Sequence, residues 1–328
     1  GSVVANPNGS FTVTGSQVLN SGINYFWLAY DLPTTATTGN WVDAQCTSVT
    51  VGSVRIPTVT NPMGNRAIVG ALSGYYTIGS TGDYTSFTAA ISALNTYGVS
   101  GWVTFQVQSG TYSEKITLAA VTNASAANKI TFESLTGDST DVILTYSAST
   151  YNDAATVKYD GAQYFVFQNM TVTATGTYGH AFEIAGGAIN NVIRNNVLYT
   201  SSTNFTYGSA IFSYPGTNAA TRIVQNKIQS VGAAIYLRGT NTATNTSGWE
   251  IDSNVISADQ YGIYLYYASN NKLRSNHITM SSSGATGYGI YAYYAVYPME
   301  ISGNKIVMQS SNQAYGAYVY SSSGVSTN

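Results

Sequence analysis

The chain is poor in charge, cysteine, histidine and proline, and each shortage excludes a class of protein. Only 8% of its 328 residues are charged, against about 25% in an average soluble domain. The net charge of −2 provides no basic surface for nucleic acid or an anionic membrane. The single cysteine, Cys46, excludes an internal disulfide, and we predict that it is a buried thiol in a strand.

Long apolar runs are also missing. No stretch has the length of a membrane span and none has the pattern of a signal peptide, so we expect no membrane insertion. Solubility must come from Ser, Thr, Asn and Gly, a composition common in secreted bacterial surface proteins. We therefore predict an extracellular or cell-surface location, for a mature product or for a piece of a longer protein.

In place of charge, the second half of the chain carries a repeat. An asparagine recurs two or three residues after an apolar residue, at intervals of 27, 30, 28, 22 and 28 residues. A period in this range indicates stacked supersecondary units rather than one globular core. The recurring asparagines are Asn169, Asn196, Asn226, Asn254, Asn276 and Asn304.

Each repeat contains three short apolar runs separated by Ser, Asn and Gly. One run reads Ala210-Ile211-Phe212 and returns as Ala234-Ile235-Tyr236, and runs of this length are strands. Three strands per coil predict an all-β fold, a right-handed parallel β-helix. Asn tolerates the left-handed backbone of a tight bend, and its amide can bond to the Asn of the next coil.

The rest of the chain divides into two predicted domains. Residues 71–328 form the β-helix, with a cap helix near 84–97 that begins at an Asp83 N-cap. Residues 1–70 form a small antiparallel, sandwich-like β domain. Its predicted strands are Phe11–Thr14, Tyr25–Tyr30, Ser48–Val51 and Ala67–Val69.

Aromatic residues occupy the outward positions of one predicted wall. If Ile211 and its equivalents point inward, their neighbours point outward in two columns, about 5 Å apart from coil to coil. We call these side chains the tyrosine face and predict that they bind a ligand or, alternatively, that they stack for stability or pack on another subunit. The tyrosine face consists of Phe212, Tyr214, Tyr236, Arg238, Tyr264, Tyr266, Tyr291, Tyr293, Tyr318 and Tyr320.

Candidate catalytic groups are scarce on this wall. Glu183 is its one acid and Arg238 its one base, and both are weak candidates because they lie two coils apart. His180 and His277 are at least three coils apart and are predicted to be surface residues without metal-ligand spacing. Calcium is conceivable at the turn with Asp138 and Asp141 or at the one with Asp153 and Asp160, but no calcium-loop pattern supports either, so no cofactor is predicted.

Other charges have a structural interpretation. The residues before the apolar anchor of the asparagine strand alternate in sign from coil to coil: Arg222, Glu250, Lys272 and Glu300. Opposite charges on neighbouring strands pair, each pair contributing about 0.2–1 kcal/mol. This ladder contains much of the charge in the repeat region and is predicted to stabilise the stacked coils.

Two resemblances add to this interpretation. The segments Gly22–Asp31, Asp43-Ala44 and Asn61–Arg66 resemble a module of large secreted, multidomain surface proteins of Bacteroidota, which implies export and surface attachment. The segments Gly82–Ile91 and Gly110–Ile116 resemble the opening of pectin methylesterases and related β-helix proteins. The esterase's catalytic Asp-Phe-Ile-Phe-Gly-type segment is absent, so this resemblance implies the fold and not the activity.

Three functions remain. The first is a non-catalytic cell-surface module, in a large adhesive assembly, whose tyrosine face binds polysaccharide or a protein partner. The second is a polysaccharide lyase or hydrolase that uses the same face, where lyases of this fold hold their oligosaccharide according to the resemblance. The third is a structural subunit of an extracellular filament or surface layer. Scarcity of acids and bases favours the first and third.

Overall fold

The computed structural model divides the chain into two units, Gly1–Val69 and Gly70–Asn328. It describes residues 11–15, 18, 20–24, 32–33, 36–37, 39–61, 66–202, 208–281, 286–309, 313–323 and 326–327.

The described part of the first unit contains two small antiparallel sheets. In one, β1 (Trp41–Val42) pairs with β4 (Arg66–Ala67), and in the other, β2 (Val49–Val51) pairs with β3 (Ser53–Arg55). Residues 11–14 form no strand, so that prediction is wrong, and the predicted strand at residues 25–30 lies outside the described residues. Cys46 is exposed and lies between strands, which corrects the prediction of a buried thiol.

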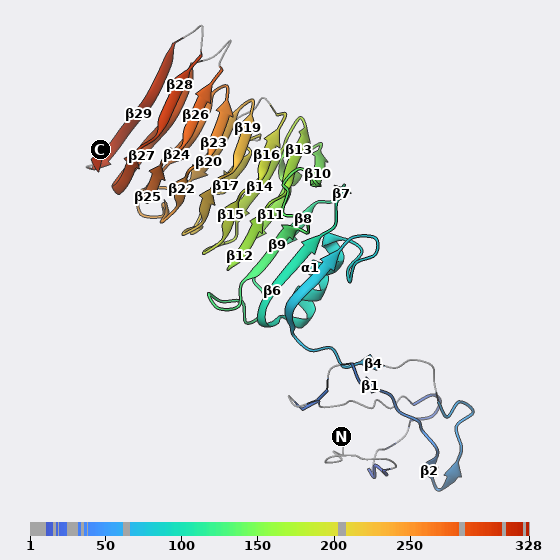
Figure 1. Cartoon of the computed structure of the whole chain (residues 1–328). Helices are drawn as coiled ribbons and strands as arrows, with labels where there is room; N and C mark the ends of the chain where they lie inside the picture. Colours follow the sequence, from blue (N-terminus) through green and yellow to red (C-terminus); the bar gives the residue numbers. More distant parts are fainter. Residues whose placement is uncertain are drawn as a thin grey trace. The chain divides into compact units, whose positions relative to one another are not determined.

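The second unit is a right-handed parallel β-helix with three walls (Figure 1). The first wall carries the tyrosine face, and β27 spans the first wall and the second. Strands of the first wall are β8 (Ile116–Leu118), β11 (Ala155–Asp160), β14 (His180–Ala185), β17 (Ile211–Ser213), β20 (Ala233–Arg238), β24 (Tyr261–Tyr266), β27 (Gly287–Ser302) and β29 (Ala314–Ser323).

The two other walls follow the first in each coil. The second wall consists of β5 (Leu72–Ile78), β6 (Val99–Val107), β9 (Ile130–Ser134), β12 (Phe165–Gln168), β15 (Val192–Arg194), β18 (Arg222–Val224), β22 (Glu250–Asp252), β25 (Ala268–Arg274) and β30 (Ser326–Thr327), with the short β21 (Thr246–Ser247) beside β25. The third wall is a sheet of eight strands: β7 (Gly110–Tyr112), β10 (Val142–Ala148), β13 (Thr171–Gly176), β16 (Val197–Thr200), β19 (Lys227–Ser230), β23 (Val255–Ala258), β26 (His277–Met280) and β28 (Lys305–Met308).

Helix α1 (Phe87–Tyr97) packs against the first coils through Phe87, Ala90, Ile91 and Leu94. It begins later than predicted because Ser86, and not Asp83, is the N-cap: the Ser86 hydroxyl accepts a hydrogen bond from the Ala89 amide. The Asp83 carboxylate instead accepts hydrogen bonds from Thr77. A short 3-10 turn, Tyr151–Asp153, is the remaining helical element among the described residues.

The asparagine ladder is confirmed between the second and third walls. The Asn226 side-chain amide donates to Asn254 Oδ1 at 3.0 Å, and the Asn254 amide donates to Asn276 Oδ1 at 2.9 Å. Each rung also donates to a backbone carbonyl of the preceding coil, as Asn254 does to Ile223. The rungs are Asn196, Asn226, Asn254, Asn276 and Asn304.

Two details of the ladder correct the sequence interpretation. The left-handed residue of the bend is the one before each rung, such as Asn195 with φ 54°, and not the rung itself. Asn169 is also left-handed, and Met170 holds the rung position because its amide donates to Asn196 Oδ1. The first repeat is therefore offset by one residue, which explains why Thr171 seemed to break the apolar pattern: the buried residue is Val172, paired with Leu198.

Candidate functional site: a tyrosine-covered wall

The backbone register places the tyrosine face as predicted. In the first column, Phe212 pairs with Tyr236 and Tyr236 with Tyr264; in the second, Tyr266 pairs with Tyr293. Tyr291 pairs with Tyr318 and Tyr293 with Tyr320 on the next coil. The isoleucines that directly precede the first column point into the core and are fully buried: Ile211, Ile235, Ile263 and Ile290.

Exposure of the tyrosine face increases toward the last coils. Phe212 and Tyr236 are each 5% exposed, so they support their neighbours rather than offer surface. Tyr318 is 37% exposed and Tyr320 is 47% exposed, while Tyr214 is 51% exposed. The surface available to a ligand therefore lies mainly on β24, β27 and β29, with Tyr214 apart from it.

Two further rows of tyrosine border the face, and the sequence interpretation missed both. Tyr261, Tyr288 and Tyr315 form a flanking row that stacks at 5.3 and 5.1 Å between ring centroids. Tyr267 and Tyr294 form a corner row that stacks at 4.8 Å. The recurring Tyr-Gly-Ile-Tyr of residues 261–264 and 288–291, and the Tyr-Tyr pairs 266–267 and 293–294, were the available signals.

The flanking row breaks the period-two alternation on which the prediction depended. Gly262 and Ile263 are both buried, so the strand bends and Tyr261 turns outward beside Tyr264, with ring centroids 4.8 Å apart. A side chain at Gly262 would meet Ile278 and the backbone of Gly289. The glycine thus permits the bend that adds a third row to the wall.

The faces of the inner rings are covered by neighbouring rings rather than exposed to solvent. Tyr288 has Tyr261 on one face and Tyr315 on the other, with ring planes within 7°. Tyr293 is stacked between Tyr266 and Tyr320 in the same way. Such contacts contribute about 0.5–1.5 kcal/mol per pair. The middle rings consequently present edges and hydroxyls to a ligand instead of faces.

Packing of phenols against phenols changes their ionisation. Burial, followed by repulsion from the neighbouring tyrosines, raises the pKa of Tyr261 to about 12. A hydrogen bond to the Tyr294 hydroxyl is the main cause that raises the pKa of Tyr293 to about 12. Burial also raises the pKa values of Tyr288 and Tyr291. The surface is therefore an uncharged layer of hydroxyls at all ordinary pH values.

The two weak catalytic candidates do not form a pair. The register places Glu183 beside Phe212, and Arg238 lies two coils further on, beside Tyr266. Glu183 is 8% exposed, and its carboxylate contacts Lys158 Nζ at 3.2 Å. Partial burial alone would lower the pKa of Lys158, but the nearby Glu183 carboxylate raises it. Both side chains are therefore charged and form an ion pair on the first wall.

His180 is not a surface residue, contrary to the prediction. It is 3% exposed, its Nδ1 lies 2.9 Å from the Ser209 carbonyl oxygen, and its ring stacks on Phe212 with centroids 4.7 Å apart. Burial lowers the pKa of His180 to about 4, so the imidazole is neutral. His277 is exposed on β26, as predicted. Among the described residues, no three His, Cys, Asp or Glu side chains come together.

The carboxylates considered for calcium are engaged locally. Asp138 accepts hydrogen bonds from the amide and hydroxyl of Thr140, and Asp141 accepts one from the Thr136 hydroxyl. These contacts are typical of turn-forming aspartates.

The predicted charge ladder lies on the second wall. Glu250 contacts Arg222 Nε at 2.6 Å, Arg274 at 3.1 Å and Lys272 Nζ at 3.9 Å. Lys272 pairs with Glu300 in the backbone register, where Glu300 accepts a hydrogen bond from Ser302. These partly exposed pairs are mutually neutralised, so their role is to stabilise the stacked coils, at roughly 0–1 kcal/mol each.

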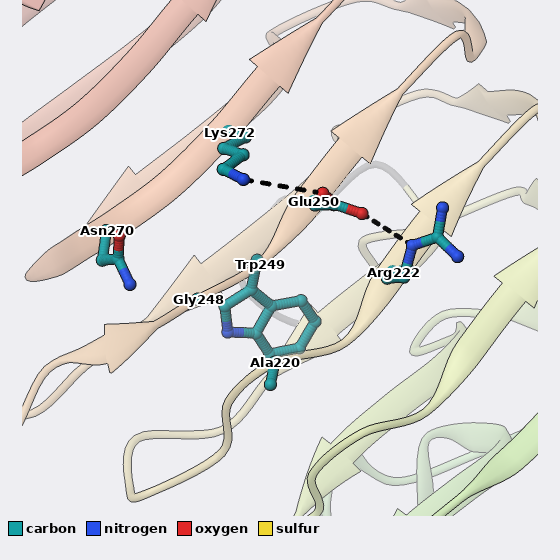
Figure 2. A pocket seen from close by; sticks show the side chains of 7 residues that line it. All are labelled: Ala220, Arg222, Gly248, Trp249, Glu250, Asn270 and Lys272. Carbon is teal, nitrogen blue, oxygen red and sulfur yellow. Dashed lines mark hydrogen bonds and ion pairs between the residues drawn. The ribbon is translucent and has the colours of Figure 1, made fainter. Parts of the chain in front are cut away.

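A shallow hollow of about 250 Å³ opens beside this ladder (Figure 2). Ala220 and Gly248 leave it free because they carry little or no side chain, and Arg222, Glu250 and Lys272 border it. Figure 2 shows Glu250 between Lys272 and Arg222, with dashed lines to both. A second hollow of about 400 Å³ adjoins it and shares Ala220 and Arg222. Both lie on the second wall, away from the tyrosine face.

The class that this geometry defines is the right-handed parallel β-helix with an aromatic wall. Residues 168–328, which include the whole tyrosine face, match the family described as "Periplasmic copper-binding protein (NosD)". No curated protein matches the chain.

Solved structures with a similar coil are enzymes acting on polysaccharides by their titles. A pectin methylesterase from Aspergillus niger is 17% identical, with a TM-score of 0.43, over 77% of this chain and 87% of its own. A carrot pectin methylesterase is 12% identical, with a TM-score of 0.43, over 80% and 90%. An alginate lyase from Paenibacillus sp. str. FPU-7 is 13% identical, with a TM-score of 0.39, over 72% and 96%.

Proposed function

We propose that the protein is a non-catalytic binding module outside the cytoplasm, whose tyrosine face binds an uncharged polysaccharide. One observation carries the proposal: three coils present ordered rows of tyrosine, and those of β24 and β27 stay partly exposed although a coil stacks on either side of them. A contiguous apolar patch that is exposed to solvent usually marks an interaction site. The assembly to which it belongs would be adhesive or attached to the cell surface.

Charge determines the class of ligand. Arg238 is the one charged side chain of the tyrosine face, and the Glu183 carboxylate on the same wall is paired with Lys158. A polyuronate would bring a carboxylate to each sugar unit and find almost no cation to receive it. Charge complementarity therefore favours a neutral glycan over an acidic one.

The contact would be made mainly by ring edges and hydroxyls. Because the faces of Tyr288 and Tyr293 are covered by other rings, sugar faces have access chiefly to the exposed outer rings, Tyr318 and Tyr320. Phenol hydroxyls both donate and accept hydrogen bonds, which suits the hydroxyls of a sugar. The stacked rings hold these hydroxyls in fixed rows, so little rotamer freedom is lost on binding.

Location outside the cytoplasm agrees with the periplasmic description of the matched family and with the low-charge composition. No helix in the described part of the chain is long and apolar enough to cross a membrane.

Copper, which the matched family's description names, is not part of the proposal. Copper sites use His, Cys or Met ligands converging on one ion. Here His180 is buried against Phe212 and bonded to Ser209, while His277 is exposed on the third wall. The two histidines of the β-helix therefore do not converge on one ion.

A lyase or hydrolase is the second candidate, and the geometry gives it little support. Such reactions need an acid and a base on either side of one bond. Glu183 is held by Lys158, and Arg238 is two coils away. Product release from a uronic acid polymer, lost in Glu183→Ala or Arg238→Ala, would establish the enzyme instead.

Equilibrium binding to a panel of soluble polysaccharides tests the proposal. The panel contains xyloglucan, mixed-linkage β-glucan and galactomannan as neutral members, with polygalacturonate and alginate as acidic ones. We expect binding to a neutral member, weakened in Tyr264→Ala and Tyr291→Ala, while Tyr75→Ala serves as a control on the first coils. Binding that is unchanged in both tyrosine-face variants, or preference for the acidic members, would contradict it.

A further inference from the structure

The tyrosine rows continue around the corner that follows the first wall. Tyr267 comes directly after Tyr266, and Tyr294 directly after Tyr293. Within each coil, the two neighbouring rings meet edge to face, with planes inclined at 64° and 65° and centroids 4.5 and 4.4 Å apart. Between coils, Tyr267 stacks on Tyr294 with planes within 5°. The aromatic surface thus has two parts, the tyrosine face and the corner row, which meet at an edge.

Backbone conformation makes these two tyrosines unusual. Both are left-handed, with φ 49° at Tyr267 and 52° at Tyr294. In two earlier coils the same corner, one residue beyond the second column, is occupied by the left-handed Gly161 and Gly186, whose φ values are 75° and 63°, while Pro215 and Gly239, which are not left-handed, occupy it in the two coils between. A side chain in this conformation costs about 1–2 kcal/mol relative to glycine. The last coils therefore carry tyrosine where glycine is the residue that the backbone prefers.

Phenol groups line this edge. The Tyr266 and Tyr267 rings lie edge to face, as do those of Tyr293 and Tyr294, and all four side chains are partly exposed. Two adjacent phenol hydroxyls offer donors and several lone pairs to a ligand. Because successive coils lie about 4.7–4.9 Å apart, the pairs form a regular line along the rod axis.

We propose that these two hydroxyl pairs, Tyr266/Tyr267 and Tyr293/Tyr294, are the principal contact for the ligand, a linear neutral polysaccharide running along the rod axis. An extended glycan presents a set of hydroxyls at each sugar unit, and the line of phenol pairs presents a matching set at each coil. The corner tyrosines then serve binding as well as stacking, because their ring contacts offset the cost of the left-handed backbone. This inference rests on the proposed function and names the part of the surface that does the binding.

Two double variants test it in the full-length chain. Tyr267→Gly with Tyr294→Gly restores the residue type of Gly161 and Gly186, so the fold should be kept while both corner rings are lost. Tyr267→Phe with Tyr294→Phe keeps the rings and their stacking and removes only the hydroxyls. Tyr164→Gly is the matched control, because Tyr164 is also left-handed, with φ 61°, but lies beside the second wall.

The readout is affinity for the neutral polysaccharide that the wild type binds, together with the thermal midpoint. Removing the corner hydroxyl from each pair should weaken binding roughly tenfold or more in each double variant. The thermal midpoint of the phenylalanine variant should match that of the wild type, and Tyr164→Gly should bind normally. Affinity should also rise with oligosaccharide length along the rod.

Other outcomes separate the two proposals. If the corner variants bind as well as wild type while Tyr264→Ala and Tyr291→Ala lose binding, the corner inference is wrong and the proposed function stands. If the glycine variant is strongly destabilised and the phenylalanine variant binds normally, the corner row is a structural brace. If the wild type binds no neutral polysaccharide, both proposals fail.

Discussion

At the scale of single residues, the interior of the described part of the chain holds a few polar side-chain atoms that the fold does not satisfy, and the Tyr159 hydroxyl is one of them. The Tyr159 side chain is fully buried on the first wall, and its hydroxyl has no hydrogen-bond partner within the described part of the chain. A buried unsatisfied group costs about 1–3 kcal/mol. Tyr159→Phe removes the hydroxyl and keeps the ring contacts with Phe165 and Phe182.

We expect Tyr159→Phe to raise the free energy of unfolding by about 1 kcal/mol, measured by denaturant titration. Tyr112→Phe is the control with the opposite sign, because the Tyr112 hydroxyl donates to the Gln108 carbonyl at 2.9 Å. Loss of stability in Tyr159→Phe would mean that its hydroxyl has a partner in solution.

His180 is the second residue with a measurable signature. Burial lowers the pKa of this imidazole to about 4 in the folded chain, from about 6.5 in the unfolded chain. The unfolded state therefore binds more protons between these values, so the stabilisation is complete above pH 6.5 and is lost as the pH falls toward 4.

Unfolding free energies measured across this range should fall with decreasing pH in the wild type, by up to about 3 kcal/mol from this group. The slope should become shallower in His180→Gln. Equal slopes in wild type and variant would show that His180 is not buried as a neutral ring.

At the scale of the repeating element, the asparagine ladder ties the second wall to the third. Asn254 accepts from both the backbone and side-chain amides of Asn226 and donates to Ile223 and Asn276. Replacing it leaves several buried groups without partners. Asn195, one residue before a rung, is exposed and left-handed and makes none of these ladder contacts.

We expect Asn254→Ala to lower the free energy of unfolding by about 2–4 kcal/mol, and Asn195→Gly to change it by less than about 1 kcal/mol. Chemical denaturation of the two variants beside wild type measures both effects. A loss of unfolding free energy well below about 2 kcal/mol in Asn254→Ala would mean that the ladder contributes little to stability.

The element scale also shows how far the sequence alone reaches. The recurring asparagine and the Ile-Tyr run determine the coil length and the register of both tyrosine columns, because parallel stacking repeats one residue position per coil. The offset at Asn169 arose because a left-handed Asn and a ladder Asn look alike in sequence. Tyr261 was missed because a bend at Gly262 interrupts the alternation that places side chains on one face.

Burial was the harder property to predict. The sequence contains no signal that Phe212 and Tyr236 lie almost covered while Tyr318 and Tyr320 stay open, because that depends on neighbouring coils. His180 seemed to be a surface residue because its partners, Phe212 and the Ser209 carbonyl, are more than twenty residues away in sequence. Composition and repeats thus predict the frame, and contacts between coils determine the site.

At the scale of the whole β-helix, the tyrosine rows behave as one uncharged layer. The pKa of Tyr261 and that of Tyr293 are raised to about 12, from 10.0, by burial and by neighbouring phenols. A raised tyrosine pKa means that the folded chain holds its protons longer than the unfolded chain. Stability from this source is complete below pH 10 and is lost as the pH rises toward 12.

Phenolate absorbance followed during an alkaline titration should therefore show a class of tyrosines that ionises late, together with loss of the β-sheet circular dichroism signal. Tyr261→Phe should reduce the late class and shift the unfolding transition to higher pH. Ionisation of all tyrosines near pH 10 with the fold intact would contradict the stacked, partly buried arrangement.

The central claim is that a neutral glycan binds on the tyrosine rows of β24, β27 and β29. Tyrosine ring resonances, recorded by NMR while a neutral oligosaccharide is added to the full chain, test this most directly. The account predicts saturable shifts for Tyr266, Tyr267, Tyr293 and Tyr294, with Tyr75 and Tyr164 unchanged. Shifts confined to tyrosines elsewhere, or none at saturating ligand, would contradict it.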